Sequence, residues 1–322
     1  MDKKFLGSKL DIKKVLALYG LKPKIVKSIK DGMINSSFFV LDQNDKQYVL
    51  RVYQRGIHKD KEILNELQTM IKFRQGGVPI PLVLENVKNQ ILTKFIDSGK
   101  SSWQVILMEF IKGHHLKSNE YQLICEFAEF QSRMHKLGKQ TKPKSKLKLS
   151  FKKMTDWLKN EEGKAVEKIS DKVLKLKFKK IVKDILAETK EKEKEILSLP
   201  AGYVHLDYDS NNIIVSGKHI DGILDFDDLS YQPLVLDSAF SLWWWLFFNP
   251  LSIHGKILQQ YNQGYTKYLK RSSVEKRLLP LFIRMRNATL AALLFINIPK
   301  YQDVKSFKKA LELDPVFKSL KL

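Results

Sequence analysis

The chain has 322 residues, with 57 Lys and Arg against 35 Asp and Glu, which gives a formal net charge of +22 at pH 7. This charge raises nucleic acid and anionic lipid as partners, while the single cysteine, Cys125, excludes an intrachain disulfide. No run of about 18 uninterrupted apolar residues occurs, and the first residues lack the apolar core of a secretory signal. We therefore expect a cytoplasmic protein without membrane insertion.

The first third of the chain is predicted to be rich in strands. An amphipathic helix over 10–21 precedes strands that include 36–42 and 47–53, which are separated by an Asn-Asp-Lys turn. Residues 59–75 have apolar side chains at helical spacing and predict one long helix. Further strands are predicted within 78–95 and 102–111. The total is about five strands and one long helix in the first 111 or so residues.

The pattern becomes mostly helical after residue 111, apart from a short β-rich piece over 202–229. The segment 141–199 holds 18 lysines, often paired with Glu, which is typical of a solvated helix face. Arginine is scarce there and aromatic residues are not interleaved, so a nucleic-acid groove is unlikely on this pattern. The apolar run 239–248 is interpreted as a core helix; the alternative is a membrane-surface segment.

Polar residues are concentrated in "HLDYDSNN" at 205–212. Asp207 is followed five residues later by Asn212, and Asp225 comes 18 residues after Asp207. Two short apolar strands joined by Ser-Gly-Lys lie between Asn212 and Asp225, so a hairpin would bring these two residues together. Hard oxygen ligands of this kind suit Mg²⁺. The alternative interpretation is a plain polar loop with Asx-turns.

This spacing resembles the catalytic loop and the metal-binding Asp-Phe pair of kinases. The resemblance implies that His205 braces the loop and that Asp207 accepts the proton of the attacking hydroxyl. It also implies that Asn212 and Asp225 hold Mg²⁺ against the phosphates of ATP.

A nucleotide clamp is expected in the first part of the chain. Gly32, Asn35 and Ser36 lie between the first two strands, where a phosphate-covering loop belongs. Because side chains alternate along a strand, Val49 and Arg51 should share one face, with Val49 on the adenine and Arg51 in the place of the phosphate-binding lysine of kinases.

The expected partner of that arginine is Glu66 on the following helix; the alternative is that both are ordinary surface charges. The apolar strand that ends near residue 111 fits a hinge, whose backbone at Glu109–Ile111 would meet the adenine edge.

Together these segments resemble the aminoglycoside phosphotransferase, choline kinase and homoserine kinase group of the protein-kinase-like fold. The similarity covers nearly the whole chain and includes "GMINSSFFV", "YVLRVY" and "LDSAF". It implies an α+β, two-lobed fold: an antiparallel-sheet nucleotide-binding lobe over 1–111 and a mostly helical catalytic and substrate lobe over 112–322, with the lysine-rich segment at about 140–199. In this family the residue at Asp237 begins a helix and supports the catalytic loop.

The implied activity is transfer of the ATP γ-phosphoryl group, with Mg²⁺, to a hydroxyl of a small molecule. Asp209, Asp227 and Asp228 would suit a substrate with an ammonium group, such as an amino alcohol, a homoserine-like amino acid or an aminosugar; alternatively they cap turns. An atypical protein kinase and an inactive nucleotide-binding scaffold are the other hypotheses. Asp209 stands where protein kinases carry Lys, and Leu206 replaces the small residue common in the family.

Overall fold

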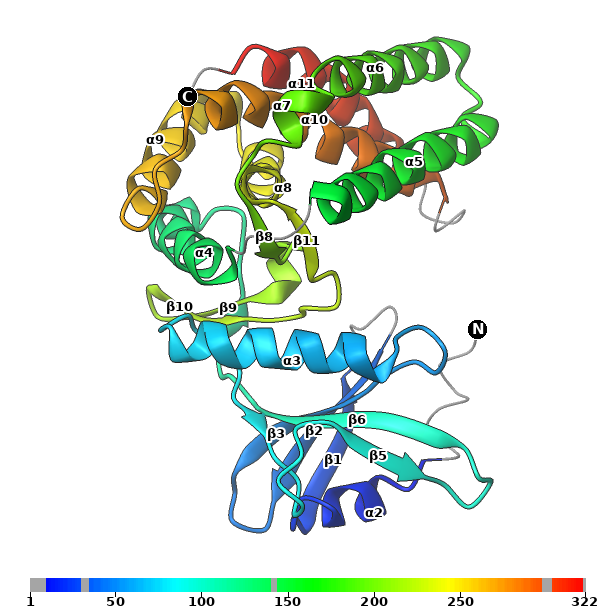
Figure 1. The fold of residues 1–322 in the computed structure, drawn as a ribbon, viewed down its shortest axis with the longest axis vertical. Helices are drawn as coiled ribbons and strands as arrows, with labels where there is room; N and C mark the ends of the chain where they lie inside the picture. The colour runs from blue at the N-terminus through cyan, green and yellow to red at the C-terminus, as the bar shows by residue number, and fades with distance from the viewer. Residues whose placement is uncertain (1–9, 30–34, 140–143, 297–302, 321–322) are drawn as a thin grey trace. The chain divides into compact units, whose positions relative to one another are not determined.

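The computed structural model describes residues 10–29, 35–139, 144–296 and 303–320 (Figure 1). The chain divides into two compact units. The first comprises Met1–His114 with the short pieces Ile214–Gly217 and Asp221–Leu224, and the second comprises the remainder. The assignment of nucleotide binding to residues 1–111 and of catalysis and substrate binding to residues 112–322 stays a prediction.

The first unit is built on one antiparallel sheet of six strands, one more than the sequence suggested. Its spatial order is β1-β2-β3-β6-β4, and β5 pairs separately with β6. The strands are β1 (Pro23–Ile29), β2 (Ser36–Asp42), β3 (Gln47–Val52), β4 (Val83–Leu84), β5 (Thr93–Ile96) and β6 (Ser102–Glu109).

Two helices lie on opposite faces of this sheet, α2 (Ile12–Ala17) and α3 (Asp60–Gln75) (Figure 1). The strand pattern explains the packing, because alternate residues of β2, Phe38 and Val40, are buried on the same face. They join Leu50 and Val52 of β3 in a core cluster that also holds residues of α2.

A short hairpin, β9 (Ile213–Ser216) and β10 (His219–Ile223), follows the polar segment at 205–212. Its turn contains Gly217 at φ 61°, a left-handed conformation that favours glycine. β9 also pairs with β7 (His114–His115).

The second unit is mostly helical and also contains a two-stranded pairing of β8 (Ala201–Val204) with β11 (Ser230–Pro233). The sequence did not suggest β11. The helices are α4 (Ile124–Gly138), α5 (Lys144–Lys168), α6 (Lys172–Glu191), α7 (Glu193–Ile196), α8 (Leu234–Phe248), α9 (His254–Tyr265), α10 (Ser273–Ile296) and α11 (Val304–Lys318).

Helix α8 is the centre of the second unit, and all of Leu234–Phe247 is buried. The apolar run 239–248 is therefore a core helix, as predicted. α10 packs against α8 and is the one described helix long and apolar enough to cross a membrane. Because 67% of its most apolar window is buried inside the structure, we interpret α10 as a core helix as well.

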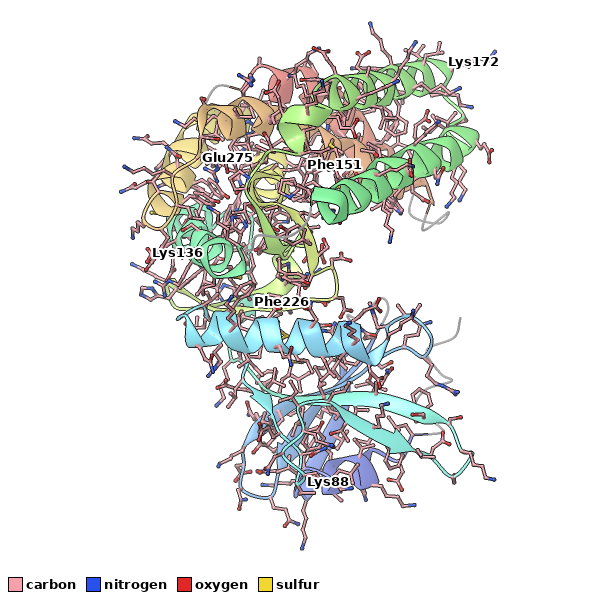
Figure 2. All side chains as sticks on the ribbon, in the orientation of Figure 1. Lys88, Lys136, Phe151, Lys172, Phe226 and Glu275 are labelled. Atoms are coloured by element: carbon pink, nitrogen blue, oxygen red, sulfur yellow. The ribbon has the colours of Figure 1, made fainter. Side chains whose placement is uncertain are left out.

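The lysine-rich segment forms α5 and α6. On α6, Phe178, Ile181 and Ile185 are buried, whereas lysines such as Lys172 at its start project away from the core (Figure 2). This agrees with the predicted solvated helix face.

Candidate active site

The loop between β8 and β9 holds Asp207 in a fixed position. The Asn212 side-chain amide donates one hydrogen bond to the Asp207 carbonyl and one to its Oδ2, both at 2.9 Å. The Asp207 N–H donates to His205 Nδ1 at 3.2 Å. Since 32% of the Asp207 side chain is exposed, this carboxylate is both oriented and accessible.

His205 is a buried support for this loop. Its ring is 1% exposed, stacks on Tyr208 at 4.4 Å between centroids and meets Phe226 edge-on at 4.5 Å. Phe226, labelled in Figure 2, is itself fully buried. The Phe of the predicted Asp-Phe pair thus packs on the His of the predicted catalytic loop.

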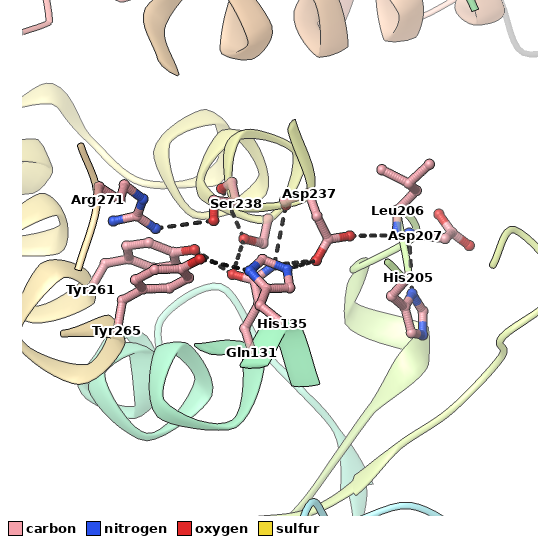
Figure 3. A network of polar contacts seen from close by, with 11 residues as sticks. Gln131, His135, His205, Leu206, Asp207, Asp237, Ser238, Tyr261, Tyr265 and Arg271 are labelled. Carbon is pink, nitrogen blue, oxygen red and sulfur yellow. Dashed lines mark hydrogen bonds and ion pairs between the residues drawn. The ribbon is translucent and has the colours of Figure 1, made fainter. Parts of the chain in front are cut away.

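Asp237, in the first turn of α8, anchors the same loop through a backbone N–H (Figure 3). Its Oδ1 accepts the Leu206 N–H at 2.7 Å, and its Oδ2 accepts Gln131 Nε2 at 2.8 Å and lies 2.7 Å from His135 Nε2. Burial alone would raise the pKa of this carboxyl, but the hydrogen bond and charge of His135, the Leu206 N–H and the charge of His205 together place the pKa below its usual value. We therefore describe Asp237 as a buried carboxylate with three donors.

The partners of Asp237 are held in turn by two tyrosines of α9 and by Ser241 of α8. Tyr261 and Ser241 donate to Gln131 Oε1, and the Tyr265 hydroxyl lies 2.7 Å from His135 Nδ1 (Figure 3). Burial raises the pKa of both tyrosines, so both hydroxyls keep their protons at neutral pH. A signal for this network lies in the spacing of α4, because Phe127, Gln131 and His135 are four residues apart and share one helix face.

Two residues of the candidate site have left-handed backbone conformations. Leu206 has φ 68° and Asp225 has φ 62°. Asp tolerates this region, but for Leu it is a strained conformation, held here by the bond to Asp237. Leu206 thus adopts with strain a conformation that glycine, which has no Cβ, would adopt easily.

Asn212 and Asp225 are the predicted Mg²⁺ ligands. They lie at the same open end of the β9–β10 hairpin, because Asn212 directly precedes β9 and Asp225 follows β10 by two residues. Asn212 uses its amide nitrogen on Asp207, which leaves its Oδ1 as the donor for a metal. A carboxylate and an amide oxygen fit Mg²⁺, which keeps several waters and shares phosphate oxygens. Among the described residues, no three His, Cys, Asp or Glu side chains are grouped for a metal.

The carboxylates of the predicted acidic cluster, Asp209, Asp227 and Asp228, follow Asp207 in sequence, and the charges of Asp209 and Asp228 interact with that of Asp207. Partial removal from water, and then the charge of Asp207, raise the pKa of Asp209 and of Asp228. Asp209 also accepts the Asn211 N–H at 2.7 Å, so it caps a turn in addition to carrying charge. Asp227 lies between these groups in sequence and is partly buried. Crowded carboxylates of this kind favour a bound cation.

One cation beside Asp207 was not foreseen from the sequence. Arg286 of α10 places its Nη2 3.5 Å from Asp207 Oδ1. Residue 286 lies about 80 positions beyond the catalytic loop in a helix with no motif, so only the fold brings the two residues together.

In the first unit, Arg51 and Glu66 are both buried, at 9% and 5% exposure, and both contact Tyr53. The Arg51 guanidinium lies 5.8 Å from the Tyr53 ring centroid, and the Tyr53 hydroxyl donates to Glu66 Oε1 at 3.0 Å. The two are therefore not ordinary surface charges. A direct Arg51–Glu66 pair and a role for Val49 at the adenine stay predictions.

The remaining expected nucleotide contacts fall near the ends of these strands. Asn35 Oδ1 accepts the Gln54 N–H at 2.9 Å and so braces the start of β2, while Ser36 pairs with Val52. The Glu109 N–H is bonded to the Leu82 carbonyl, and Ile111 is half-buried beyond the end of β6. Gly32 lies outside the described residues.

Comparison with known proteins gives the family. The profile of the phosphotransferase enzyme family (APH) matches residues 25–271. A homoserine kinase of Beijerinckia indica is 24% identical over 304 residues, which cover 91% of this chain and 88% of the relative. A homoserine kinase of Rhizobium meliloti is 25% identical over 258 residues, covering 80% and 74%.

Solved structures show the same fold at low identity. Amicoumacin kinase hAmiN, in complex with AMP-PNP, Ca²⁺ and Ami, has a TM-score of 0.70 at 17% identity, and the match covers 98% of this chain and 96% of that chain. A microcompartment-associated aminopropanol kinase also has a TM-score of 0.70 at 17% identity, with 96% and 95% covered.

These similarities confirm the predicted α+β, protein-kinase-like fold. They favour a small-molecule enzyme over the protein kinase and the inactive scaffold. The chain belongs to the phosphotransferase enzyme family and is a small-molecule kinase.

Proposed function

We propose that this enzyme transfers the γ-phosphoryl group of ATP to a hydroxyl group of a small, amine-bearing molecule. The observation that carries the proposal is the accessible Asp207 carboxylate, oriented by Asn212 and surrounded by further carboxylates. The names of the related homoserine kinases and of the aminopropanol kinase support an amine-bearing acceptor.

In the proposed step, Asp207 accepts a hydrogen bond from the acceptor hydroxyl and takes its proton as the reaction proceeds. A bond forms between that hydroxyl oxygen and the γ-phosphorus, and the bond between the γ-phosphorus and the β–γ bridging oxygen breaks, so that ADP leaves. Asn212 keeps the Asp207 carboxylate in one orientation, and Asp237 holds the loop through the Leu206 N–H.

Asn212 and Asp225 are the residues that would hold Mg²⁺, which supplies charge neutralisation at the phosphates when it is bound. On the first unit, Arg51 would bind phosphate oxygens, because its guanidinium stays charged at every working pH. The backbone carbonyl of Glu109 and the N–H of Ile111 are the groups we assign to the adenine edge.

Asp209, Asp227 and Asp228 would bind the ammonium group of the acceptor. Asp209 and Asp228 carry charge that costs energy without a cation, as their raised pKa values indicate. The proposal includes a cytoplasmic location, which suits ATP-dependent chemistry and a chain with one cysteine, the half-buried Cys125.

The test is ADP release measured against a panel of hydroxylated amines, amino acids, aminosugars and non-amine sugars, with Mg²⁺ present. We expect turnover to be confined to amine-bearing acceptors. Turnover with simple sugars alone would contradict the amine assignment. ADP release that no acceptor stimulates would contradict the proposed phosphoryl transfer.

A further inference from the structure

Arg286 of α10 lies beside the proposed catalytic carboxylate, Asp207. Its Nη2 lies 3.5 Å from Asp207 Oδ1, which is long for a charge-assisted hydrogen bond. Its Nε is buried and has no hydrogen-bond partner among the described residues. The side chain is 22% exposed, so the guanidinium remains partly accessible.

Arg284, two residues earlier on the same helix, shows the contrast. It is 2% exposed and makes close charge-assisted bonds with Asp314 and Glu188. That arginine satisfies buried carboxylates and joins α10 to α11 and α6. Arg286 makes no such close bonds: the ion pair found for it is the 3.5 Å contact with Asp207, and its charge also acts to lower the pKa of Asp209 and of Asp228.

The guanidinium of Arg286 is held on an aromatic platform. The Cζ atom of Arg286 lies 5.1 Å from the centroid of the Phe240 ring and 5.6 Å from the centroid of the Trp243 ring, and both rings belong to α8. The Trp243 ring is itself fixed, because its Nε1 donates to Asn287 Oδ1 at 3.1 Å. Stacking restrains the side chain without using its N–H groups, so those groups stay available for an anion.

An arginine beside a proton-accepting carboxylate weakens that carboxylate as a base, because it stabilises the ionised form. Contact with the carboxylates of the site does not use the whole guanidinium, because the nearest of them, Asp207, lies 3.5 Å away. The guanidinium has five N–H donors in a planar fork, so contact with Asp207 leaves donors for another acceptor. A carboxylate is the planar group that this fork matches best.

We propose that Arg286 binds the carboxylate group of the acceptor, and that the acceptor is a hydroxyl-bearing amino acid. Its ammonium group would face the carboxylates of Asp209 and Asp228, and its hydroxyl would face Asp207. The site would then offer a cation for the carboxylate and carboxylates for the ammonium group of a zwitterion. An amino alcohol or an aminosugar has an ammonium group but no carboxylate. This inference rests on the proposed phosphoryl transfer and narrows its substrate class.

The test compares each amino acid with the amino alcohol left when its carboxylate is removed: L-homoserine with aminopropanol, and L-serine with ethanolamine. For the better amino acid we expect kcat/KM to exceed that of its amino alcohol by about 10- to 100-fold, the range of one hydrogen-bonded charge pair. Arg286→Gln should remove most of this preference by raising KM for the amino acid, with little change for the amino alcohol. Arg286→Lys should recover part of it.

Arg277→Gln is the matched control. Arg277 lies on the same helix, is exposed and pairs with Glu195, so the same chemical change there should leave both substrates unaffected. Melting curves of all variants show whether a loss of preference comes from unfolding. A folded Arg286→Gln enzyme with the wild-type preference would overturn the proposal.

Two further results would also overturn it. If wild-type enzyme uses amino alcohols as well as the matching amino acids, the site has no carboxylate subsite, although the kinase activity stands. If Arg286→Gln lowers kcat equally for both members of a pair, Arg286 acts on the phosphoryl group or on Asp207 instead. ADP release with none of the acceptors would remove the proposed function itself, and the inference with it.

Discussion

At the scale of single residues, the site contains one carboxylate whose surroundings lower its pKa and two whose surroundings raise it. Asp237 is buried with three donors, and its pKa is below the usual value because His135, the Leu206 N–H and His205 together outweigh burial. For Asp209 and Asp228 the compensating contacts, Arg286 among them, are outweighed by removal from water and by the charge of Asp207, so their pKa values are raised. The lowered pKa stabilises the fold, and the raised pKa values cost stability until a cation binds.

Asp237→Asn tests the effect of the lowered pKa. An amide offers one acceptor oxygen to the three donors Leu206 N, Gln131 Nε2 and His135 Nε2, so a donor is left unpaired in the core. We expect a loss of about 3–5 kcal/mol of unfolding free energy at pH 7. Because the folded pKa is lowered, the wild-type advantage is present above pH about 4 and is lost as pH falls further. Urea unfolding at several pH values measures this, and a pH-independent difference would contradict it.

Asp209→Asn tests the effect of a raised pKa. Asn can still accept the Asn211 N–H, so the turn is preserved while the crowded charge is removed. Since the folded pKa of Asp209 is raised, we expect the variant to melt about 2 °C higher at pH 7 and the gain to vanish below pH about 4, where Asp209 is protonated in both states. KM for the amine substrate should rise about tenfold. A lower melting temperature at pH 7 would contradict the assignment.

Arg51→Met tests the nucleotide side of the account. Loss of a cation at the phosphates should lower kcat/KM for ATP by about 100-fold, since one electrostatic contact to developing charge has that magnitude. Arg55→Met, at an exposed arginine that stacks on Trp103, is the control. Near-parental kinetics for folded Arg51→Met would show that another cation holds the phosphates.

At the scale of elements, the packing of α4 on α9 supports the position of the proposed catalytic loop at 205–212. α4 carries Gln131 and His135, α9 carries Tyr261 and Tyr265, and together they hold Asp237 (Figure 3). The two helices approach closely at Gly264, where an added Cβ would lie 1.9 Å from the Cys125 carbonyl oxygen. Only glycine permits this approach.

Gly264→Ala should therefore force α4 and α9 apart. We expect a loss of about 1–3 kcal/mol in unfolding free energy, the usual cost of overpacking, together with reduced turnover as Asp237 shifts. Gly255→Ala on the same helix is the control, because nothing lies within 4 Å of its added Cβ; it should be neutral or stabilising by up to about 1 kcal/mol. Equal unfolding free energies for the two variants would contradict this account of the packing.

At the scale of the whole molecule, the sequence predicted those parts that local patterns encode. Alternation in "SSFFVLD" predicted β2, and helical spacing in 59–75 predicted α3, because each pattern reports burial on one face of a regular element. The order of His205, Asp207, Asn212 and Asp225 predicted a loop and hairpin since these residues are close in sequence.

Contacts between distant segments could not be predicted in the same way. Arg286 reaches Asp207 through the packing of α10 on α8, and no motif marks it. β11 is only four residues long and its pairing with β8 is a tertiary contact. Asp237 was expected to support the loop from the family resemblance, but its partners on α4 and α9 depend on helix packing that local spacing does not report.

The central claim is that Asp207 is the carboxylate that engages the acceptor hydroxyl. The most direct measurement is ADP release by Asp207→Asn with the best acceptor, together with calorimetry of Mg·ATP binding. Asn can keep the Asn212 contact but cannot take a proton, so we predict a fall in kcat of at least about 100-fold with ATP affinity preserved. Turnover within about tenfold of the wild type would contradict the account.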